Sequence, residues 1–188
     1  NLRLCWCKEW DQWYEMQVDT QDERAIVKHV TCTALGEAEL SQTMIYGLEI
    51  NTENDIARDD YNHYGLPDET HALWDDRFMH NSILYRLMSK VPHYSIDHVD
   101  ATIAKEQRTF SFNGMSVYDC LQEIALEYEC VVFVHANSNP DGSIHRGISL
   151  YDLQNTCQSC GERGEFLHVC SKCGSSNIKR GYGEDTTS

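Results

Sequence analysis

Four cysteines in the last third of the chain have the type and spacing of metal ligands. They form two Cys-x-x-Cys pairs, each followed by glycine and separated by nine residues: Cys157, Cys160, Cys170 and Cys173. Zn²⁺ at structural sites takes four such sulfur ligands in a tetrahedron. Two intervening residues let both sulfurs of a pair face one ion, and the glycine can adopt the positive φ angle that closes the turn. The pattern therefore predicts one structural Zn²⁺ per chain, held by a zinc ribbon.

The alternatives to zinc at these cysteines are an iron–sulfur cluster, disulfides or, for one pair alone, a redox site. Two pairs in register favour a metal. Because protein sulfurs fill all four positions, a zinc ion here lacks the open position that catalytic zinc needs for water or substrate. Zinc binding contributes about 10–16 kcal/mol in zinc-finger peptides, enough to fold a small ribbon that has no core of its own. We therefore expect a structural role.

Five further cysteines are scattered among apolar neighbours: Cys5, Cys7, Cys32, Cys120 and Cys130. A disulfide scaffold is usually shorter and richer in loops, so this usage favours a reducing compartment, with buried thiols acting as small hydrophobic groups. Cys5 and Cys7 share one side of an expected strand and, with Cys32, could form a second metal site. No fourth ligand is evident, and we prefer core packing.

Carboxylates and an imidazole gather before residue 77: Asp68, Glu69, His71, Asp75 and Asp76. A hydrolase could use them as acid, base or metal ligands, but a solvated acidic loop also explains them and is preferred. His80 lies on an expected apolar helix face and is interpreted as a core or interface histidine. The sequence contains no Gly-rich phosphate loop, G-x-S-x-G elbow or H-E-x-x-H motif. We predict no catalytic residues and no enzymatic activity in this chain.

Charge and composition narrow the classes of partner. The chain has 188 residues, 41% of them hydrophobic, and a formal net charge of −15. Nucleic-acid binding depends on Lys and Arg neutralising phosphates, so we expect no nucleic-acid partner, although the ribbon itself is mildly basic. No apolar run approaches the ~20 residues of a membrane helix, and we identify no signal peptide. The absence of an initiator Met suggests a fragment of a longer protein.

The elements that must position these residues follow from hydrophobic spacing. Residues 1–50 are expected to be β-rich, with strands at 2–6, 13–18, 25–34 and 44–50 and a polar hairpin loop at 19–24. A polar stretch with Gly65 and Pro67 predicts a long loop over 51–76. Apolar residues at helical spacing predict a helix over 77–91, which Pro92 ends.

Residues 108–151 predict a strand, a helix and a β-hairpin. Phe110 and Phe112 alternate in a strand over 108–113. Ser116 followed by Asp119 is typical of a capping box, and the helix it begins extends to Tyr128. Strands are expected over 130–135 and 144–151, joined by the turn residues 137–142.

This region resembles the N-terminal structural region of tail proteins from siphophages and prophages, which are minor structural, tail-associated or tail-spike proteins related to baseplate hubs. An R-T-F strand lies at 105–112, an S-x-x-D-x-L helix at 116–125, a strand with Cys and Phe at 129–133, and an I-x-L-Y-D strand at 148–152. Weaker similarity covers 40–52 and 183–186. The four cysteines are absent from familiar members, so the ribbon resembles an insertion between two strands.

We expect an α+β fold: an antiparallel β-rich domain with two main helices, which the resemblance implies is barrel-like, and the embedded four-cysteine zinc ribbon that the cysteine spacing predicts. The expected boundaries are 1–153 for this domain, 154–183 for the ribbon and 184–188 for the return into the parent protein. The implied function is a non-catalytic structural subunit of a phage or prophage tail tip or baseplate. Its implied partners are other tail subunits, with a homotrimer for the full-length protein and no membrane contact.

The resemblance further implies a location in the virion tail after assembly in the bacterial cytoplasm, with any peptidase or lysin activity outside this fragment. Two alternatives from other classes stay open. One is a zinc-ribbon protein that binds nucleic acid or acts as a regulator. The other is a cell-wall hydrolase that uses the acidic loop.

Overall fold

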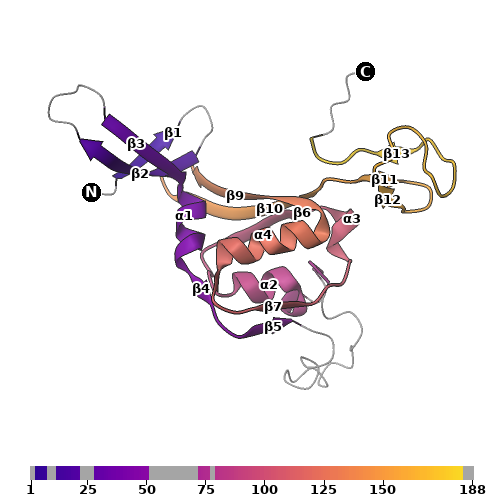
Figure 1. Cartoon of the computed structure of the whole chain (residues 1–188), viewed down its shortest axis with the longest axis horizontal. Helices are drawn as coiled ribbons and strands as arrows, with labels where there is room; N and C mark the ends of the chain where they lie inside the picture. Colours follow the sequence, from indigo (N-terminus) through magenta and orange to yellow (C-terminus); the bar gives the residue numbers. More distant parts are fainter. Residues whose placement is uncertain (1–2, 8–11, 22–27, 51–71, 77–78, 184–188) are drawn as a thin grey trace.

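The computed structural model describes residues 3–7, 12–21, 28–50, 72–76 and 79–183. A compact α/β core lies in the middle of the molecule, with a three-stranded antiparallel sheet at one end and the cysteine-rich ribbon at the other (Figure 1). The described chain therefore consists of a core and two β-structured projections.

The central sheet has the strand order β6-β10-β9. Strands β9 (Cys130–Ser138) and β10 (Ile144–Asp152) form an antiparallel hairpin whose pairing runs from Ser138 and Ile144 to Cys130 and Asp152. Strand β6 (Ser95–Val99) pairs with β10 in parallel. Alternation along β10 turns Ile148 and Leu150 into the core, where both are buried.

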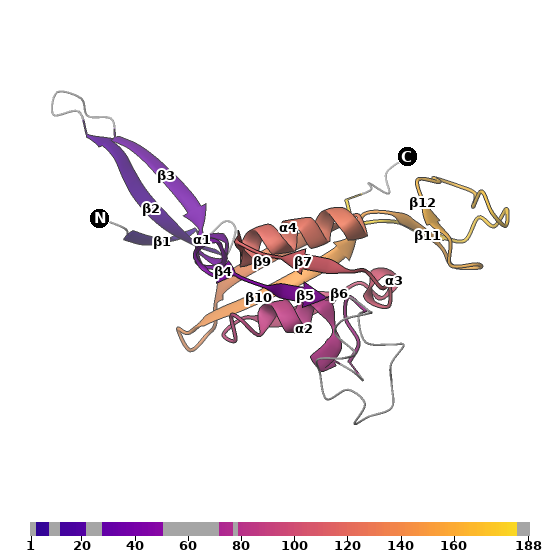
Figure 2. The ribbon, with the colours of Figure 1, turned by 60° about the horizontal axis from the view of Figure 1, so that its bottom comes forward.

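Helix α4 (Val117–Tyr128) packs on this sheet (Figure 2). Its start is a capping box: the Ser116 hydroxyl accepts from the Asp119 backbone N–H at 3.1 Å, and the Asp119 carboxylate accepts from the Ser116 backbone N–H at 3.3 Å. Its apolar stripe is buried at Val117, Cys120, Leu121, Ile124 and Tyr128. Capping and stripe together explain why the sequence predicts this helix well.

Short elements complete the core. The helical ones are α1 (Leu35–Gln42), the 3₁₀ turn η2 (Met79–Asn81), α2 (Ile83–Met88) and α3 (Ala101–Ala104). Two-stranded ladders pair β4 (Met44–Ile45) with β8 (Met115–Ser116), and β5 (Leu48–Ile50) with β7 (Phe110–Phe112). Side chains from the short helices and ladders, though not from η2, meet those of α4 in one cluster that includes Leu40, Ile50, Leu84, Phe112, Ile103 and Leu121.

The N-terminal sheet has the order β1-β2-β3 and consists of β1 (Arg3–Cys7), β2 (Gln12–Gln21) and β3 (Lys28–Ala34). All of its pairings are antiparallel. It joins the core through the Gln12 side-chain amide, which donates to the Val134 carbonyl at 3.2 Å, and the Trp13 indole, which donates to the Ser138 hydroxyl at 3.0 Å. Figure 1 shows this sheet projecting away from the core.

The fold confirms the mixed α and β class with mostly antiparallel pairing, and within the described ranges it contains four α-helices and five open ladders or sheets. None of these sheets closes on itself, so the barrel-like part of the prediction is not confirmed. The predicted single strand 44–50 is wrong: Gly47 adopts φ +61° and divides it into β4 and β5. The parallel strand β6 and helices α1 and α3 were not predicted.

The predicted helix over 77–91 is also too long. In its described part it is divided into η2 and the six-residue α2, because Ser82 adopts an extended conformation between them. Most of the predicted 51–76 loop, at 51–71, and most of the predicted hairpin loop lie outside the described residues. The division of domains at residue 153 stays a prediction. Among the helices that the structure describes, none has the length and apolarity to span a bilayer.

Candidate metal centre

The four predicted ligands lie in a small three-stranded sheet with the order β12-β11-β13. The strands are β11 (Asn155–Cys157), β12 (Arg163–Gly164) and β13 (Ile178–Lys179). Two turns, at 157–161 and 170–174, carry the cysteines. The metal centre is thus assembled by two local turns that the short sheet holds together.

The two turns have the same backbone hydrogen bonds. Gly161 N–H donates to the Cys157 carbonyl at 2.8 Å, and Gly174 N–H donates to the Cys170 carbonyl at 2.9 Å. The two glycines have φ angles of +75° and +70°, a region that other residues adopt at a cost. In addition, the N–H of the first cysteine of each pair donates at 2.8 Å to the carbonyl five residues later. Each Cys-x-x-Cys-Gly segment is therefore a hydrogen-bonded turn, called a knuckle below, that brings its two cysteines together.

The sulfur atoms of all four cysteines converge. They lie within 4.8 Å of one another, with 3.5 Å between Cys157 and Cys173 and 3.6 Å between Cys160 and Cys170. A disulfide needs about 2.05 Å, so these are separate thiols. A tetrahedral ion with metal–sulfur bonds of about 2.3 Å separates its ligands by about 3.8 Å. The four predicted residues therefore form one cluster that could hold a single metal ion.

Hydrogen bonds around the cluster favour a thiolate at Cys157. Burial raises the pKa of this thiol, but the backbone N–H groups of Ser159 and Cys160 stabilise the anion and bring the pKa down to about 6. For Cys160 the backbone N–H of Glu162 acts in the same direction, but contacts with neighbouring thiols and burial prevail and raise the pKa to about 12. Four sulfurs this close cannot all ionise unaided, and a bound cation would allow it.

Arg163 of β12 connects the ribbon to the core. Its guanidinium donates to both carboxylate oxygens of Asp152, at 2.9 and 2.8 Å, and to the Tyr128 carbonyl at 3.1 Å. It also pairs with the Glu106 carboxylate. The Asp152 side chain is only 3% exposed. Because the Arg163 guanidinium forms two hydrogen bonds with the buried Asp152 carboxylate, it fixes the ribbon against the ends of α4 and β10.

Further contacts reinforce the same junction. The Asn155 side chain accepts from Gly181 N–H at 2.8 Å and donates to the Phe166 carbonyl at 3.1 Å. Lys179 pairs with Asp100 at 3.0 Å. A Cβ atom on Gly181 would lie 2.1 Å from the Leu153 carbonyl oxygen, so glycine is required where the chain returns. Sequence reasoning missed these residues and Arg163, because their partners are remote in the sequence.

The five other cysteines do not belong to this cluster. Among the described residues, Cys157, Cys160, Cys170 and Cys173 are the only group of three or more potential ligands with converging donor atoms, so Cys5, Cys7 and Cys32 do not form a second such group. Cys120 and Cys130 are buried in the core, where burial raises the pKa of each thiol to about 12. These two confirm the interpretation of cysteines as small hydrophobic groups.

Of the acidic-loop candidates, Asp75 and Asp76 lie within the described residues, where each has a different partner. Asp68, Glu69 and His71 lie outside the described residues. Asp75 is buried and pairs with Lys105 at 2.5 Å, and Asp76 accepts a hydrogen bond from the Trp74 indole at 2.7 Å. His80 is exposed and stands edge-on to Tyr85, so the core part of its interpretation is wrong and the interface part stays a prediction.

Comparison with known proteins identified no relative: no protein-family model, no curated protein and no solved structure matches the chain.

Proposed function

We propose that the four cysteines bind one structural Zn²⁺ and that the chain is a structural subunit of a phage or prophage tail tip or baseplate. The metal assignment is supported by the four converging sulfurs. All four ligands come from protein, and the knuckle glycines and N–H groups suit a closed thiolate site. In this role Zn²⁺ would cross-link the two cysteine turns, and the contacts of Arg163 and Lys179 with the core would orient the ribbon.

The tail assignment is supported by one observation above others: the segments that resemble tail proteins pack into a single unit. The R-T-F strand is β7, the S-x-x-D-x-L helix is α4, and the last two segments are β9 and β10. The characteristic residues of these segments are core residues with little or no exposure: Phe110, Phe112, Leu121, Cys130, Ile148 and Leu150. Their burial fits the proposal that these segments form the core of a tail-protein fold.

The overall shape is also suited to assembly. Two β-structured projections extend from opposite ends of the core (Figures 1 and 2). Projections of this kind offer contact surfaces to neighbouring subunits. The fold class and the closed metal site both fit a scaffold.

The ribbon's cations argue against nucleic-acid binding. Arg163 and Lys179 pair with core carboxylates, and Lys172 pairs with Glu162 at 2.7 Å. Binding to phosphates would have to break these pairs in a chain of net charge −15. The regulatory alternative therefore receives no support from the geometry.

Immunogold electron microscopy tests the tail assignment. Antibodies raised against residues 1–188 are applied to tailed particles from an induced culture of the source bacterium. We expect gold at the tail end distal to the capsid. Unlabelled particles, with the antigen confined to the soluble fraction, would contradict the assignment.

Two further measurements address the alternatives. Salt-resistant binding of the purified chain to duplex or single-stranded DNA would support the nucleic-acid hypothesis. Cell-wall hydrolysis that the Asp75→Ala variant abolishes would support the hydrolase.

A further inference from the structure

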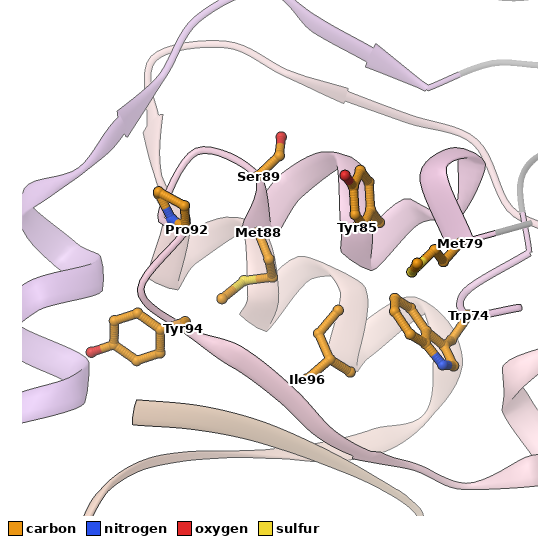
Figure 3. Close-up of a pocket in the computed structure, with 8 residues that line it drawn as sticks. All are labelled: Trp74, Met79, Tyr85, Met88, Ser89, Pro92, Tyr94 and Ile96. Atoms are coloured by element: carbon orange, nitrogen blue, oxygen red, sulfur yellow. The ribbon is translucent and has the colours of Figure 1, made fainter. Parts of the chain in front are cut away.

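Two features of the described chain have chemical potential beyond a scaffold: a pocket in the core and the sulfurs of the ribbon. The pocket, of about 470 Å³, opens between η2, α2 and β6 (Figure 3). Its polar groups are already satisfied, because the Trp74 indole donates to Asp76 and the Tyr94 hydroxyl donates to Glu39. Nothing in the described residues shows what covers it, whereas the sulfurs have reactive partners within the chain.

The sulfurs of the cysteine cluster are paired between the two turns. Cys157 of the first turn lies 3.5 Å from Cys173 of the second turn. Cys160 of the first turn lies 3.6 Å from Cys170 of the second. The S–S bond of a disulfide is about 2.05 Å long, so each pair would have to close by about 1.5 Å. Two disulfides formed in this way would join the same two turns that a shared metal ion joins.

Contacts that contain no sulfur also hold the two turns face to face. The hydroxyls of Ser159 and Ser175 lie 2.7 Å apart, and the Gln158 backbone N–H donates to the Asn177 carbonyl at 2.8 Å. A single hydrogen bond of this kind adds only modestly to stability. These contacts therefore orient the turns without being sufficient to hold them together, and the opposition of the sulfurs does not depend on the metal alone.

Each of the two sulfur pairs combines an accessible and an inaccessible cysteine. Cys173 and Cys160 are exposed, whereas their partners Cys157 and Cys170 are 0% and 1% exposed. An oxidant in solution reaches the exposed sulfur first, and the buried sulfur is then the nearest thiol to the oxidised one. Redox-sensing cysteines have this arrangement of an accessible thiol beside a resolving thiol.

We propose that hydrogen peroxide converts the metal-binding cluster into two disulfides, Cys157–Cys173 and Cys160–Cys170, which keep the ribbon closed without the metal. In each pair the exposed thiolate attacks one peroxide oxygen, and the O–O bond breaks to give a sulfenic acid and hydroxide. The buried thiolate then attacks the sulfenic sulfur, which forms the S–S bond and expels a second hydroxide. Two peroxide molecules thus accept four electrons from four thiolates. The resulting neutral disulfides are no longer metal ligands, so the ion is released as Zn²⁺.

The inference rests on the zinc part of the proposed function and is independent of the tail part. In a reducing compartment the thiolates would hold the metal, and in an oxidising medium, where disulfides persist, the disulfides would replace it. The ribbon would stay attached to the core in both states, because the hydrogen bonds between Arg163 and Asp152 involve no sulfur. The ribbon would therefore keep its place on the subunit through a change of redox environment.

Peptide mapping of the oxidised full chain tests the proposal. The zinc-loaded chain is treated with two equivalents of hydrogen peroxide, its remaining thiols are blocked, and the denatured chain is digested with trypsin without reduction. Trypsin cleaves after Arg163 and Lys172, so the four cysteines fall into three peptides, 147–163, 164–172 and 173–179. Mass spectrometry then shows which peptides are linked, and fragmentation of the linked species identifies the paired sulfurs.

We expect one species that contains all three peptides, with the pairs Cys157–Cys173 and Cys160–Cys170. Zinc release, followed with a colorimetric chelator, should reach one ion for every two disulfides, and dithiothreitol with added zinc should reverse both changes. In the presence of a chelator, the oxidised ribbon should be cleaved by protease at least about tenfold more slowly than the reduced one. Cys32→Ser, which removes an exposed thiol outside the cluster, is the control and should match the wild type.

The inference would be overturned by disulfides confined to each turn, by sulfinic acids in place of disulfides, or by zinc that stays bound in excess peroxide. Disulfides within a turn would leave peptide 147–163 separate from the other two. A chain that purifies without zinc would contradict the metal assignment itself, and the peptide map of its oxidised form would still decide the disulfide pairing. The tail assignment would depend on the immunogold result in every case.

Discussion

At the scale of single residues, the metal centre depends on each of its four sulfurs. Cys157 and Cys170 are buried and Cys160 and Cys173 are exposed, yet all four sulfurs lie within one 4.8 Å cluster. A tetrahedral ion bound here would take two buried and two exposed sulfurs. Loss of either kind of ligand leaves three sulfurs and an open position.

Serine substitution at one ligand should therefore remove the metal. We expect one zinc per chain for the wild type in elemental analysis of protein purified without added metal, and much less than one for Cys173→Ser. The control is Cys32→Ser, an exposed thiol outside the cluster. Full zinc content in Cys173→Ser would contradict the ligand set, and iron with visible absorbance in the wild type would support the iron–sulfur alternative.

Arg163 is expected to contribute strongly to the stability of the folded chain. Its replacement by Met leaves the Asp152 carboxylate, 3% exposed, without its main partner. Breaking a buried pair in this way costs about 3–5 kcal/mol. We expect a loss of this order in the free energy of unfolding, measured by urea denaturation of the zinc-loaded chain.

Lys172→Met is the matched control for Arg163→Met. Its pair with Glu162 is exposed on both sides, and such pairs contribute at most about 1 kcal/mol. Equal losses for the two variants would show that the Arg163 junction has no special importance.

At the scale of elements, α1 is attached to the central sheet by an ion pair that responds to pH. Glu39 of α1 accepts two hydrogen bonds from Arg146 of β10, both at 2.7 Å, and one from the Tyr94 hydroxyl. The hydrogen bonds from Arg146 hold the pKa of the Glu39 carboxyl below its usual value. The folded state thus favours the ionised carboxylate.

The sign of the pH effect follows from this shift. A carboxyl with a lowered folded-state pKa stabilises the fold above its unfolded pKa, about 4.3 for Glu, and loses that contribution as the pH falls through the folded-state value. We expect Glu39→Gln to be less stable than the wild type at neutral pH, with a difference that shrinks below pH ~4. A difference that is independent of pH would exclude an electrostatic role for Glu39. Glu123→Gln, a change on the partly exposed side of α4, is the control.

Elements with a local sequence signal could be predicted, whereas contacts between distant residues could not. The capping box and apolar stripe of α4, and the spacing of the two cysteine pairs, lie within a few residues and could be recognised in the sequence. The parallel pairing of β6 with β10 joins residues about fifty positions apart, such as Ile96 and Ile148. Such pairings, like Arg163 with Asp152 and Glu106, depend on the packed core, and no local pattern encodes them.

At the scale of the whole molecule, the ribbon and the core differ in what stabilises them. The core buries a continuous apolar cluster, whereas most of the ribbon's side chains are at least partly exposed and its four cysteines converge in one cluster. The two parts meet at Arg163 and Asp152. Metal at one end should therefore affect the stability of the core through this junction.

Removal of the metal should release the ribbon first. In limited proteolysis with a chelator, we expect new cleavage within 158–177, followed by a more stable core fragment. With zinc bound, the same sites should be protected. Cleavage that begins equally in β9 or β10 would contradict this order of release.

The coupling can be measured by combining the two perturbations. If the metal stabilises the core by holding Arg163 against Asp152, the Arg163→Met substitution should cost less in the metal-free chain than in the zinc-loaded chain. The two losses in unfolding free energy then fail to add, as they do for residues that share one network. Additive losses would mean that the ribbon folds on its metal without affecting the core. A non-additive result would make zinc a determinant of the stability of the core, because Arg163 joins the ribbon to the buried Asp152 carboxylate of the core through two hydrogen bonds.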